Sequence, residues 1–181
     1  ERIHSNAYAA KQLNLPYDSR SEYEFYLDLK KEYIKSNISV FPNFRSRDLF
    51  NEYYDIENVQ ILPLGGLSNS ITYFSNEAGF FPIIQTDKYG FANINNNLYE
   101  VDKLDILLVG DSGTEGYSVM QNDSYAGLLN KRKYSTISLG KSGSGSLVHL
   151  ANLVEYANIF KPRNVLWMYY DNDIQDLEKE L

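Results

Sequence analysis

Cysteine is absent from this 181-residue sequence, and histidine occurs only twice, as His4 and His149. The lack of cysteine excludes disulfides, thiolate nucleophiles and cysteine-ligated zinc, although it does not distinguish a cytoplasmic from an exported protein. Two histidines so far apart in the sequence do not favour a histidine-based metal site. We therefore expect neither a metal nor a cofactor.

Long apolar runs and clusters of basic residues are also lacking. The longest apolar stretches, residues 106–109 and 165–170, have the length of strands, so the sequence predicts neither a membrane span nor a signal-peptide core. The formal charge of −7 repels phosphate backbones and anionic lipid surfaces, and no run of lysine or arginine offsets it. We expect no nucleic acid among the partners.

Tyrosine, by contrast, is abundant, with sixteen residues. Tyrosine rings can stack on sugars, and they also fill half-buried protein surface. Composition alone leaves both interpretations open.

The chain is long enough for one domain with an elaboration. We expect residues 1–100 to form an N-terminal helical and β elaboration and residues 101–181 to form part of an α/β core. Ser21 and Glu24 make a capping box that predicts the start of a helix.

The pattern within these two regions predicts their elements. Tyr23, Tyr26, Leu27 and Ile34 recur at near-helical spacing, so we expect them to pack. From residue 59 to residue 91, short apolar runs separated by turn residues predict a small antiparallel or irregular β layer. Residues 93–97, NINNN, are expected to be a loop or a hinge.

The last eighty residues alternate apolar strands, Gly/Ser loops and helices. Helices are expected near residues 119–130 and 147–160 and from residue 173, between strands that end near residues 110, 140 and 170. Continuous apolar strands separated by helices are typical of a parallel sheet covered on both faces. The predicted fold class is therefore α/β, a three-layer α/β/α sandwich.

Small and polar residues follow each predicted strand: Gly110 to Ser112 after the first, residues 140–145 after the second and residues 171–173 after the third. Functional groups of open parallel sheets gather at the carboxyl ends of the strands. We expect the three loops to meet at one site.

These loops resemble a known family. Residues 110–116, GDSGTEG, resemble the GDS-x-T-x-G block of the SGNH/GDSL hydrolases. Residues 138–143 are similar to the second block, although Ser138 stands where Asn is common. Residues 170–173 resemble the G-x-N-D block, with Tyr170 in place of Gly, and residues 86–91 look like a D-x-x-G-F lead-in found in some exported or membrane-linked members.

The resemblance covers residues 85–181 and implies an SGNH- or flavodoxin-like fold with serine-dependent ester chemistry. By resemblance Ser112 is the nucleophile, held in a tight turn that Gly110 and Gly113 permit. Asp111 orders the turn, and Gly110 and Thr114 support it. The alternative for Ser112 is a Gly/Ser turn, or an Asp/Ser cap on the following helix.

The resemblance also implies the donors that stabilise the oxyanion. They are the backbone N–H groups of Ser112 and Gly143 and the side-chain amide of Asn172. The alternatives are a helix-start glycine in a flexible loop for Gly143 and an N-cap for Asn172.

A phosphate-cradling loop is a rival use of such glycine-rich turns. Neither GDSGTEG nor GKSGSG has the Walker or the dinucleotide spacing, and Asp111 and Glu115 would repel phosphate. The sequence does not favour this function.

The base is missing from the pattern. The family supplies a His, with an Asp three residues earlier, from a final block that this sequence does not contain. His149 lies in a predicted helix where the family places no catalytic residue, so we expect a structural or surface histidine. Either the protein continues past Leu181, or this is a relative that has lost catalysis.

The resemblance thus implies an SGNH-type esterase or acyltransferase acting on a small acyl ester or an acylated glycan, and we expect a location outside the cytoplasm. The alternative is a catalytically incomplete domain that binds a carbohydrate or a partner protein. We also expect both ends to be boundaries of processing or order, and a membrane-linked or C-terminal segment to complete the fold, because half a parallel sheet exposes an edge. A third possibility is that residues 1–100 dock to a membrane partner.

Overall fold

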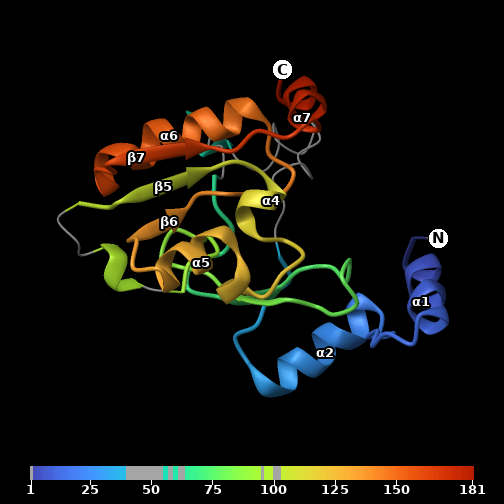
Figure 1. Ribbon diagram of the computed structural model, residues 1–181. Coiled ribbons are helices and arrows are strands. Elements are labelled where there is room, and N and C mark those ends of the chain that lie inside the picture. Colours follow the sequence, from blue (N-terminus) through green and yellow to red (C-terminus); the bar gives the residue numbers. More distant parts are fainter. Residues whose placement is uncertain (1, 40–54, 57–58, 61–63, 95, 100–102) are drawn as a thin grey trace.

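A computed structural model describes residues 2–39, 55–56, 59–60, 64–94, 96–99 and 103–181. These residues form a mixed α/β fold around a three-stranded parallel sheet (Figure 1). The strands are β5 (Ile106–Val109), β6 (Thr136–Ser138) and β7 (Asn164–Trp167), in the order β6-β5-β7. The α/β class and the parallel sheet predicted from the sequence are therefore confirmed.

The core lies around β5 and β6. In the parallel register Leu107 stands opposite Ile137 on one side and Val165 on the other. Leu107 and Ile137 are fully buried, as expected for a central apolar strand and its neighbour. The buried cluster on this sheet comprises Phe91, Leu104, Leu107, Val109, Ile137, Leu139 and Phe160.

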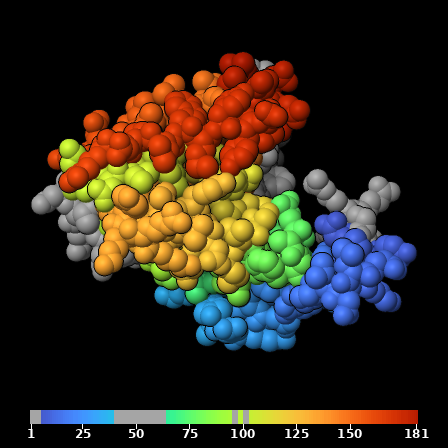
Figure 2. Space-filling model, in the orientation of Figure 1, coloured from blue at the N-terminus to red at the C-terminus, as the bar shows by residue number. Residues whose placement is uncertain are grey.

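The outer strand β7 departs from the prediction of a sheet covered on both faces. All four of its residues are exposed, and 40–46% of the surface of Val165, Leu166 and Trp167 is accessible to solvent. Within the described residues β7 pairs with β5 alone, so its other edge carries unpaired backbone groups. Figure 2 shows this part of the chain at the surface, beside the C-terminal helix.

Helices follow the strands; the three longer ones were predicted, and the short first one was not. They are α4 (Ser112–Glu115), α5 (Tyr125–Lys131), α6 (Ser146–Phe160) and α7 (Asp173–Glu180). α5 contacts β6, α6 contacts β5, and α7 packs against α6. The arrowheads of β5 and β7 point toward the side of the molecule that carries α4 and α7 (Figure 1).

The helix predicted near residues 119–130 begins later than expected. A short 3-10 turn, η3 (Gln121–Asp123), precedes α5, and Ser124 caps α5 by accepting the N–H of Gly127 at 3.1 Å. The Gln121 side chain exchanges two hydrogen bonds with the backbone of Gln85, at 3.0 and 2.6 Å. This tertiary contact holds the segment in a turn, which local periodicity cannot predict.

The N-terminal region contains α1 (Arg2–Gln12) and α2 (Glu22–Glu32). The capping box of Ser21 and Glu24 is confirmed. Of the predicted packing face, Tyr26 packs against the buried aromatic cluster, whereas the prediction is wrong for Tyr23, Leu27 and Ile34, which are 68%, 42% and 84% exposed.

Phe25 and Leu29 are the buried residues of α2. The Phe25 ring stacks on Phe81 at a centroid distance of 4.3 Å and meets Tyr73 edge-on at 5.1 Å. These aromatic contacts orient the helix, while the tyrosines, which can place a hydroxyl in water, occupy its outer side.

Two antiparallel pairs form the predicted β layer: β1 (Asp55–Ile56) with β2 (Val59–Gln60), and β3 (Ile71–Tyr73) with β4 (Ile83–Gln85). Of the predicted loop at residues 93–97, residue 95 lies outside the described residues, and residues 96–99 form a 3-10 turn, η2. Among the helices of the described ranges, none has both the length and the apolarity to cross a membrane.

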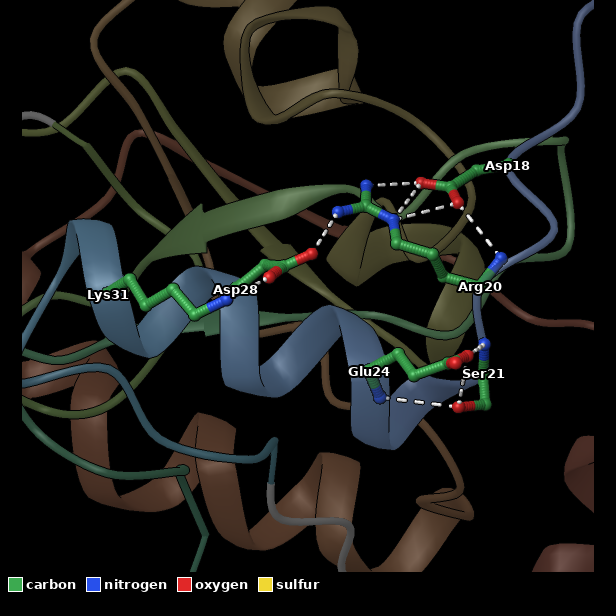
Figure 3. A network of polar contacts seen from close by, with 6 residues as sticks. All are labelled: Asp18, Arg20, Ser21, Glu24, Asp28 and Lys31. Atoms are coloured by element: carbon green, nitrogen blue, oxygen red, sulfur yellow. Dashed lines mark hydrogen bonds and ion pairs between the residues drawn. The ribbon is translucent and has the colours of Figure 1, made fainter.

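The start of α2 carries a polar network (Figure 3). Arg20 donates to Asp18 and Asp28, and Lys31 donates to Asp28. The Ser21 backbone N–H donates to the Glu24 carboxylate at 2.8 Å. The hydrogen bond from Arg20 is the main cause that lowers the pKa of Asp18, and the Ser21 backbone hydrogen bond is the main cause for Glu24.

This network predicts acid sensitivity at α2. A carboxyl group with a lowered pKa in the folded state stabilises the fold above its ordinary pKa, near 4, and that stabilisation is lost as the pH falls through the lowered value. We expect the free energy of unfolding, measured in urea, to fall below about pH 4. In the Ser21→Ala variant the free energy of unfolding should be about 1 kcal/mol lower at pH 7, and it should fall less as the pH is lowered.

Ser19→Ala is the matched control. Ser19 lies two residues before the cap and makes no hydrogen bond with the residues that the structure describes. It should leave stability unchanged. Equal losses in the two variants would contradict the role of the cap.

Candidate active site

Ser112 lies at the carboxyl end of the central strand. Two residues, Gly110 and Asp111, separate it from β5, and it is the first residue of α4. Its side chain is half-buried and lines a hollow of about 370 Å³. Three tyrosines line the same hollow: Tyr117, Tyr125 and Tyr170. The serine is thus presented to a space that can hold a small molecule.

Asp111 connects the first predicted block with the third. Its Oδ1 accepts the backbone N–H of Gly113 at 3.0 Å and so caps α4, which agrees both with a residue that orders the turn and with the alternative of an Asp cap on the following helix. Its Oδ2 accepts both the hydroxyl of Ser112, at 3.3 Å, and the side-chain amide of Asn172, at 3.0 Å. One carboxylate oxygen therefore joins Ser112 to Asn172 across 60 residues of sequence.

Asn172 stands at the N-cap position of α7, but its side chain makes no capping hydrogen bond. The alternative of an N-cap therefore agrees with its position, although the side chain does not make the capping hydrogen bond. Its Nδ2 donates to Asp111 Oδ2 and, at 3.2 Å, to Asp176 Oδ2. The amide is held beside Ser112 by two carboxylates.

Gly110 and Gly113 are required for a different reason than predicted. Neither has a positive φ, so the turn does not depend on their conformational freedom. A Cβ on Gly110 would lie 2.1 Å from Thr114 Oγ1, and one on Gly113 would lie 2.7 Å from the Tyr170 ring. Close packing excludes larger residues, and the ring of Tyr170 packs against the turn that carries Ser112.

The loop that carries Gly143 is fixed to the turn that carries Ser112. The backbone N–H of Lys141 donates to the carbonyl of Gly110 at 3.1 Å, and that of Ser142 donates to Glu115 Oε2 at 2.7 Å. Lys141 Nζ forms an ion pair with Glu115 Oε1 at 2.9 Å, in which both side chains are almost fully buried. Gly143 itself adopts a left-handed conformation, with φ 71°. The alternative of a flexible loop does not agree with these contacts.

Two backbone N–H groups follow strands of this sheet and belong to residues that the resemblance gives as oxyanion donors. Within the described part of the chain, the N–H groups of Ser112 and Gly143 donate to no protein acceptor. Both follow strands whose carboxyl ends lie at the same edge of the sheet. Unsatisfied N–H groups near a nucleophile are the donors that an oxyanion needs.

No family model, curated protein or solved structure matches this chain. What the site can do is therefore inferred from its own residues. Among those that the structure describes, no group of three His, Asp or Glu side chains is arranged to hold a metal ion.

His149 is not the base of Ser112. It lies in α6 with no exposed surface, and its Nε2 is 3.0 Å from the hydroxyl of Ser144. Ser112 instead hydrogen-bonds to Asp111. Of the two roles expected for His149, the surface histidine is wrong and the structural histidine agrees with its burial.

Sequence reasoning missed the contacts that support the site. Asn93 exchanges two hydrogen bonds of 2.9 Å with the backbone of Ser138, so it borders β6 and is not a hinge. The Ser138 hydroxyl donates to the carbonyl of Thr114 at 3.0 Å, which ties the second block to α4. The unlike charges of Glu115 and Lys141, in two loops expected to meet, were the signal that could have predicted the buried pair.

Asp87, in the D-x-x-G-F segment, organises the neighbouring turn. Its Oδ1 accepts the backbone N–H groups of Tyr89 and Phe91 at 2.8 and 3.0 Å. Its Oδ2 accepts Asn93 Nδ2 at 2.7 Å and the hydroxyl of Tyr99. Burial, followed by the charge of Asp87, raises the pKa of Tyr99, so the tyrosine remains a donor.

We expect Asp87→Ala to lower the free energy of unfolding by about 3 kcal/mol, because it leaves buried donors unsatisfied. Asp87→Asn retains one acceptor oxygen and should cost less. Urea denaturation of the two variants measures the difference. Equal stability of Asp87→Ala and the wild type would contradict the organising role.

Proposed function

We propose that this chain carries the nucleophile and the oxyanion donors of an SGNH/GDSL-type serine ester hydrolase or acyltransferase. The observation that supports it most is the shared oxygen of Asp111, which joins Ser112 and Asn172 beside a hollow. The resemblance of three ordered loops to the family pattern supports the same function. The shared oxygen alone, or the resemblance alone, would also agree with a turn that has a structural role and no catalytic one.

The proposed chemistry begins with attack of Ser112 Oγ on an ester carbonyl carbon, while a base takes the hydroxyl proton. The carbonyl oxygen becomes an oxyanion, which the N–H groups of Ser112 and Gly143 and the amide of Asn172 stabilise. The alcohol then leaves, and water or an acceptor hydroxyl takes the acyl group. During this step one N–H of Asn172 would leave Asp111 and donate its hydrogen bond to the oxyanion instead.

The proposal requires a base from another part of the full-length protein or from a partner. His149 is bonded to Ser144, and among the described residues the Ser112 hydroxyl hydrogen-bonds to the Asp111 carboxylate alone. A histidine from the family's final block would fill this role.

We further propose that the sheet is the centre of a three-layer α/β/α sandwich. The contacts of α5 with β6 and of α6 with β5 support this arrangement. The free, apolar edge of β7 supports a further segment that completes the sheet, either C-terminal or membrane-linked. The division at residue 100 stays a prediction.

The hollow supports an uncharged acyl ester as substrate, such as an acylated glycan. Its tyrosine rings can stack on a sugar. Among the residues that the structure describes, the charged ones in its lining are the carboxylates Glu77 and Asp123, without lysine or arginine, and the chain has a net charge of −7. An anionic acyl donor would be repelled. A location outside the cytoplasm stays a prediction based on the D-x-x-G-F segment.

A second candidate is a binding domain that has lost catalysis. The bond of Ser112 to a carboxylate, in place of an imidazole, favours it. In that case the hollow would bind an acylated sugar without turning it over.

Labelling separates the two candidates. The full-length protein is treated with a serine-reactive fluorophosphonate and digested, and the modified peptide is identified by mass spectrometry. The enzyme predicts an adduct on Ser112, whereas the binding domain predicts none. An adduct on another serine, with Ser112 unmodified, would also contradict the proposed function.

A further inference from the structure

The hollow beside Ser112 lies on one side of the proposed site. Ser112, Gly113 and Tyr170 belong to its lining, whereas Gly143 and Asn172 are not among its described lining residues. A carbonyl oxygen that accepts hydrogen bonds from Gly143 and Asn172 would therefore point toward residues outside the hollow. Because the carbonyl carbon of an ester has two other substituents, the hollow can receive either the acyl chain or the alcohol part.

The size and the chemistry of the hollow favour the alcohol part. Its volume of about 370 Å³ lies within the range of sites that hold a whole small ligand, about 300–1,000 Å³, and exceeds what a short acyl group fills. The aliphatic side chains of Val119 and Leu128 share the lining with the carboxylates of Glu77 and Asp123 and with serine and tyrosine hydroxyls. Aromatic rings beside hydrogen-bond acceptors suit a sugar, which has an apolar C–H face and polar hydroxyls.

Of the three tyrosines in the hollow, Tyr125 is the most exposed. Its exposed fraction is 49%, whereas Tyr117 and Tyr170 are partly buried. The Tyr117 ring stacks on Phe74 at a centroid distance of 4.7 Å, and the Tyr170 ring packs against Gly113. Protein contacts thus occupy part of two rings, and the ring of Tyr125 is the one on which a sugar can stack.

Tyr125 is held in place by its neighbours. It is the first residue of α5 and directly follows Ser124, the buried residue that caps this helix. Burial, followed by a hydrogen bond with Tyr125, raises the pKa of Tyr170, so the Tyr170 hydroxyl stays protonated and can donate to Tyr125. A side chain that is already fixed in the free protein loses little conformational entropy when a ligand binds.

Glu77 adds a hydrogen-bond acceptor to the same lining. Its Oε2 accepts the hydroxyl of Ser118 at 2.7 Å, and within the described part of the chain no group donates to its Oε1. A carboxylate oxygen is a strong acceptor for a hydroxyl group. The hollow thus offers a ring for the apolar face of a sugar and an acceptor for one of its hydroxyls.

We propose that the hollow binds the sugar of an acylated glycan, with the sugar ring stacked on Tyr125 and a hydroxyl bonded to Glu77, and that the acyl group lies outside the hollow. Tyr125 is then the specificity-determining residue for the alcohol part of the ester. Its role in turnover rests on the proposed function, whereas binding of the sugar does not require catalysis.

Hydrolysis of two acetate esters by the full-length protein tests this orientation. Methyl 6-O-acetyl-glucoside and ethyl acetate share the acyl group and differ in the alcohol. Tyr125→Ala should raise the KM for the glucoside about tenfold with kcat nearly unchanged, and should change kcat/KM for ethyl acetate less than about twofold. Tyr125→Phe keeps the ring and should recover most of the lost affinity. Tyr134→Ala removes a tyrosine of similar exposure, 51%, that is outside the lining of the hollow, and should change neither ester.

Esters that differ in acyl length give the opposite outcome. Ethyl acetate, ethyl butyrate and ethyl hexanoate share the alcohol. If Tyr125→Ala changes the ratio of their kcat/KM values and leaves the glucoside unaffected, the hollow holds the acyl chain and the proposed orientation is wrong. A wild-type protein that hydrolyses ethyl acetate with a higher kcat/KM than the glucoside would also overturn it.

An NMR titration separates this inference from the proposed function. The Ser112→Ala variant cannot form the covalent intermediate, and it should bind methyl 6-O-acetyl-glucoside with a Kd that the additional change Tyr125→Ala raises about tenfold. Such binding in a protein that forms no phosphonate adduct on Ser112 would refute the proposed function and retain the sugar site. An adduct on Ser112 without binding of the glucoside would do the reverse.

Discussion

Replacement of Ser112 by alanine is expected to lower the rate of ester hydrolysis by the full-length protein about a thousandfold or more, because the nucleophile that forms the covalent intermediate is lost. Ser112 lines the hollow and is within hydrogen-bond distance of Asp111. The substitution removes one hydroxyl from a half-buried position and should leave the free energy of unfolding nearly unchanged. Steady-state kinetics with a neutral chromogenic ester, together with urea denaturation, measure both quantities.

Ser118 provides a matched control in the same hollow. Its hydroxyl donates to Glu77 at 2.7 Å and does not contact Asp111. Ser118→Ala should retain turnover within a few-fold of the wild type. If Ser112→Ala keeps full activity, or if both variants lose activity equally, Ser112 is not the nucleophile.

The Glu115→Ala variant is expected to lower the free energy of unfolding by about 3–5 kcal/mol, the cost of removing one partner of a buried ion pair. The carboxylate neutralises Lys141 and also accepts the backbone N–H and the hydroxyl of Ser142. Its loss would release the loop that carries Gly143 from α4. Urea denaturation measures the loss of stability, and the amide resonance of Gly143 should report the released loop.

An exposed ion pair gives the control. Asp123 and Lys131 are 2.9 Å apart, with more than half of each side chain exposed. Asp123→Ala should therefore cost only about 0–1 kcal/mol. Combining Glu115→Gln with Lys141→Met removes both charges and should recover part of the stability lost on truncating Glu115. Equal losses at the buried and exposed pairs would contradict the supporting role of Glu115.

Elements with strong local patterns were predictable from the sequence. The apolar runs of β5 and β6 and the capping box before α2 depend on neighbouring residues, and the structure has them where expected. Which face of α2 is buried was not predictable, because a tyrosine side chain combines an apolar ring with a polar hydroxyl and suits either side. Phe25 is buried instead, by the rings of Tyr73 in β3 and of Phe81, which precedes β4.

The positions of the site's loops were predictable, but the contacts that hold the loops in place were not. The rule that strand ends share an edge predicted the proximity of Ser112 and Asn172, and Asp111 joins them. The packing of Tyr170 on Gly113 depends on residues far apart in the sequence. Long-range partners of this kind have no periodic signal.

The most direct test is a crystal structure of the full-length protein after reaction with a phosphonate ester, whose phosphoryl oxygen occupies the position of the oxyanion. Ser112 Oγ should be bonded to phosphorus, and that oxygen should lie about 3 Å from the N–H groups of Ser112 and Gly143 and from Nδ2 of Asn172. An adduct on another residue, or a phosphoryl oxygen that none of these three donors contacts, would contradict the proposed site.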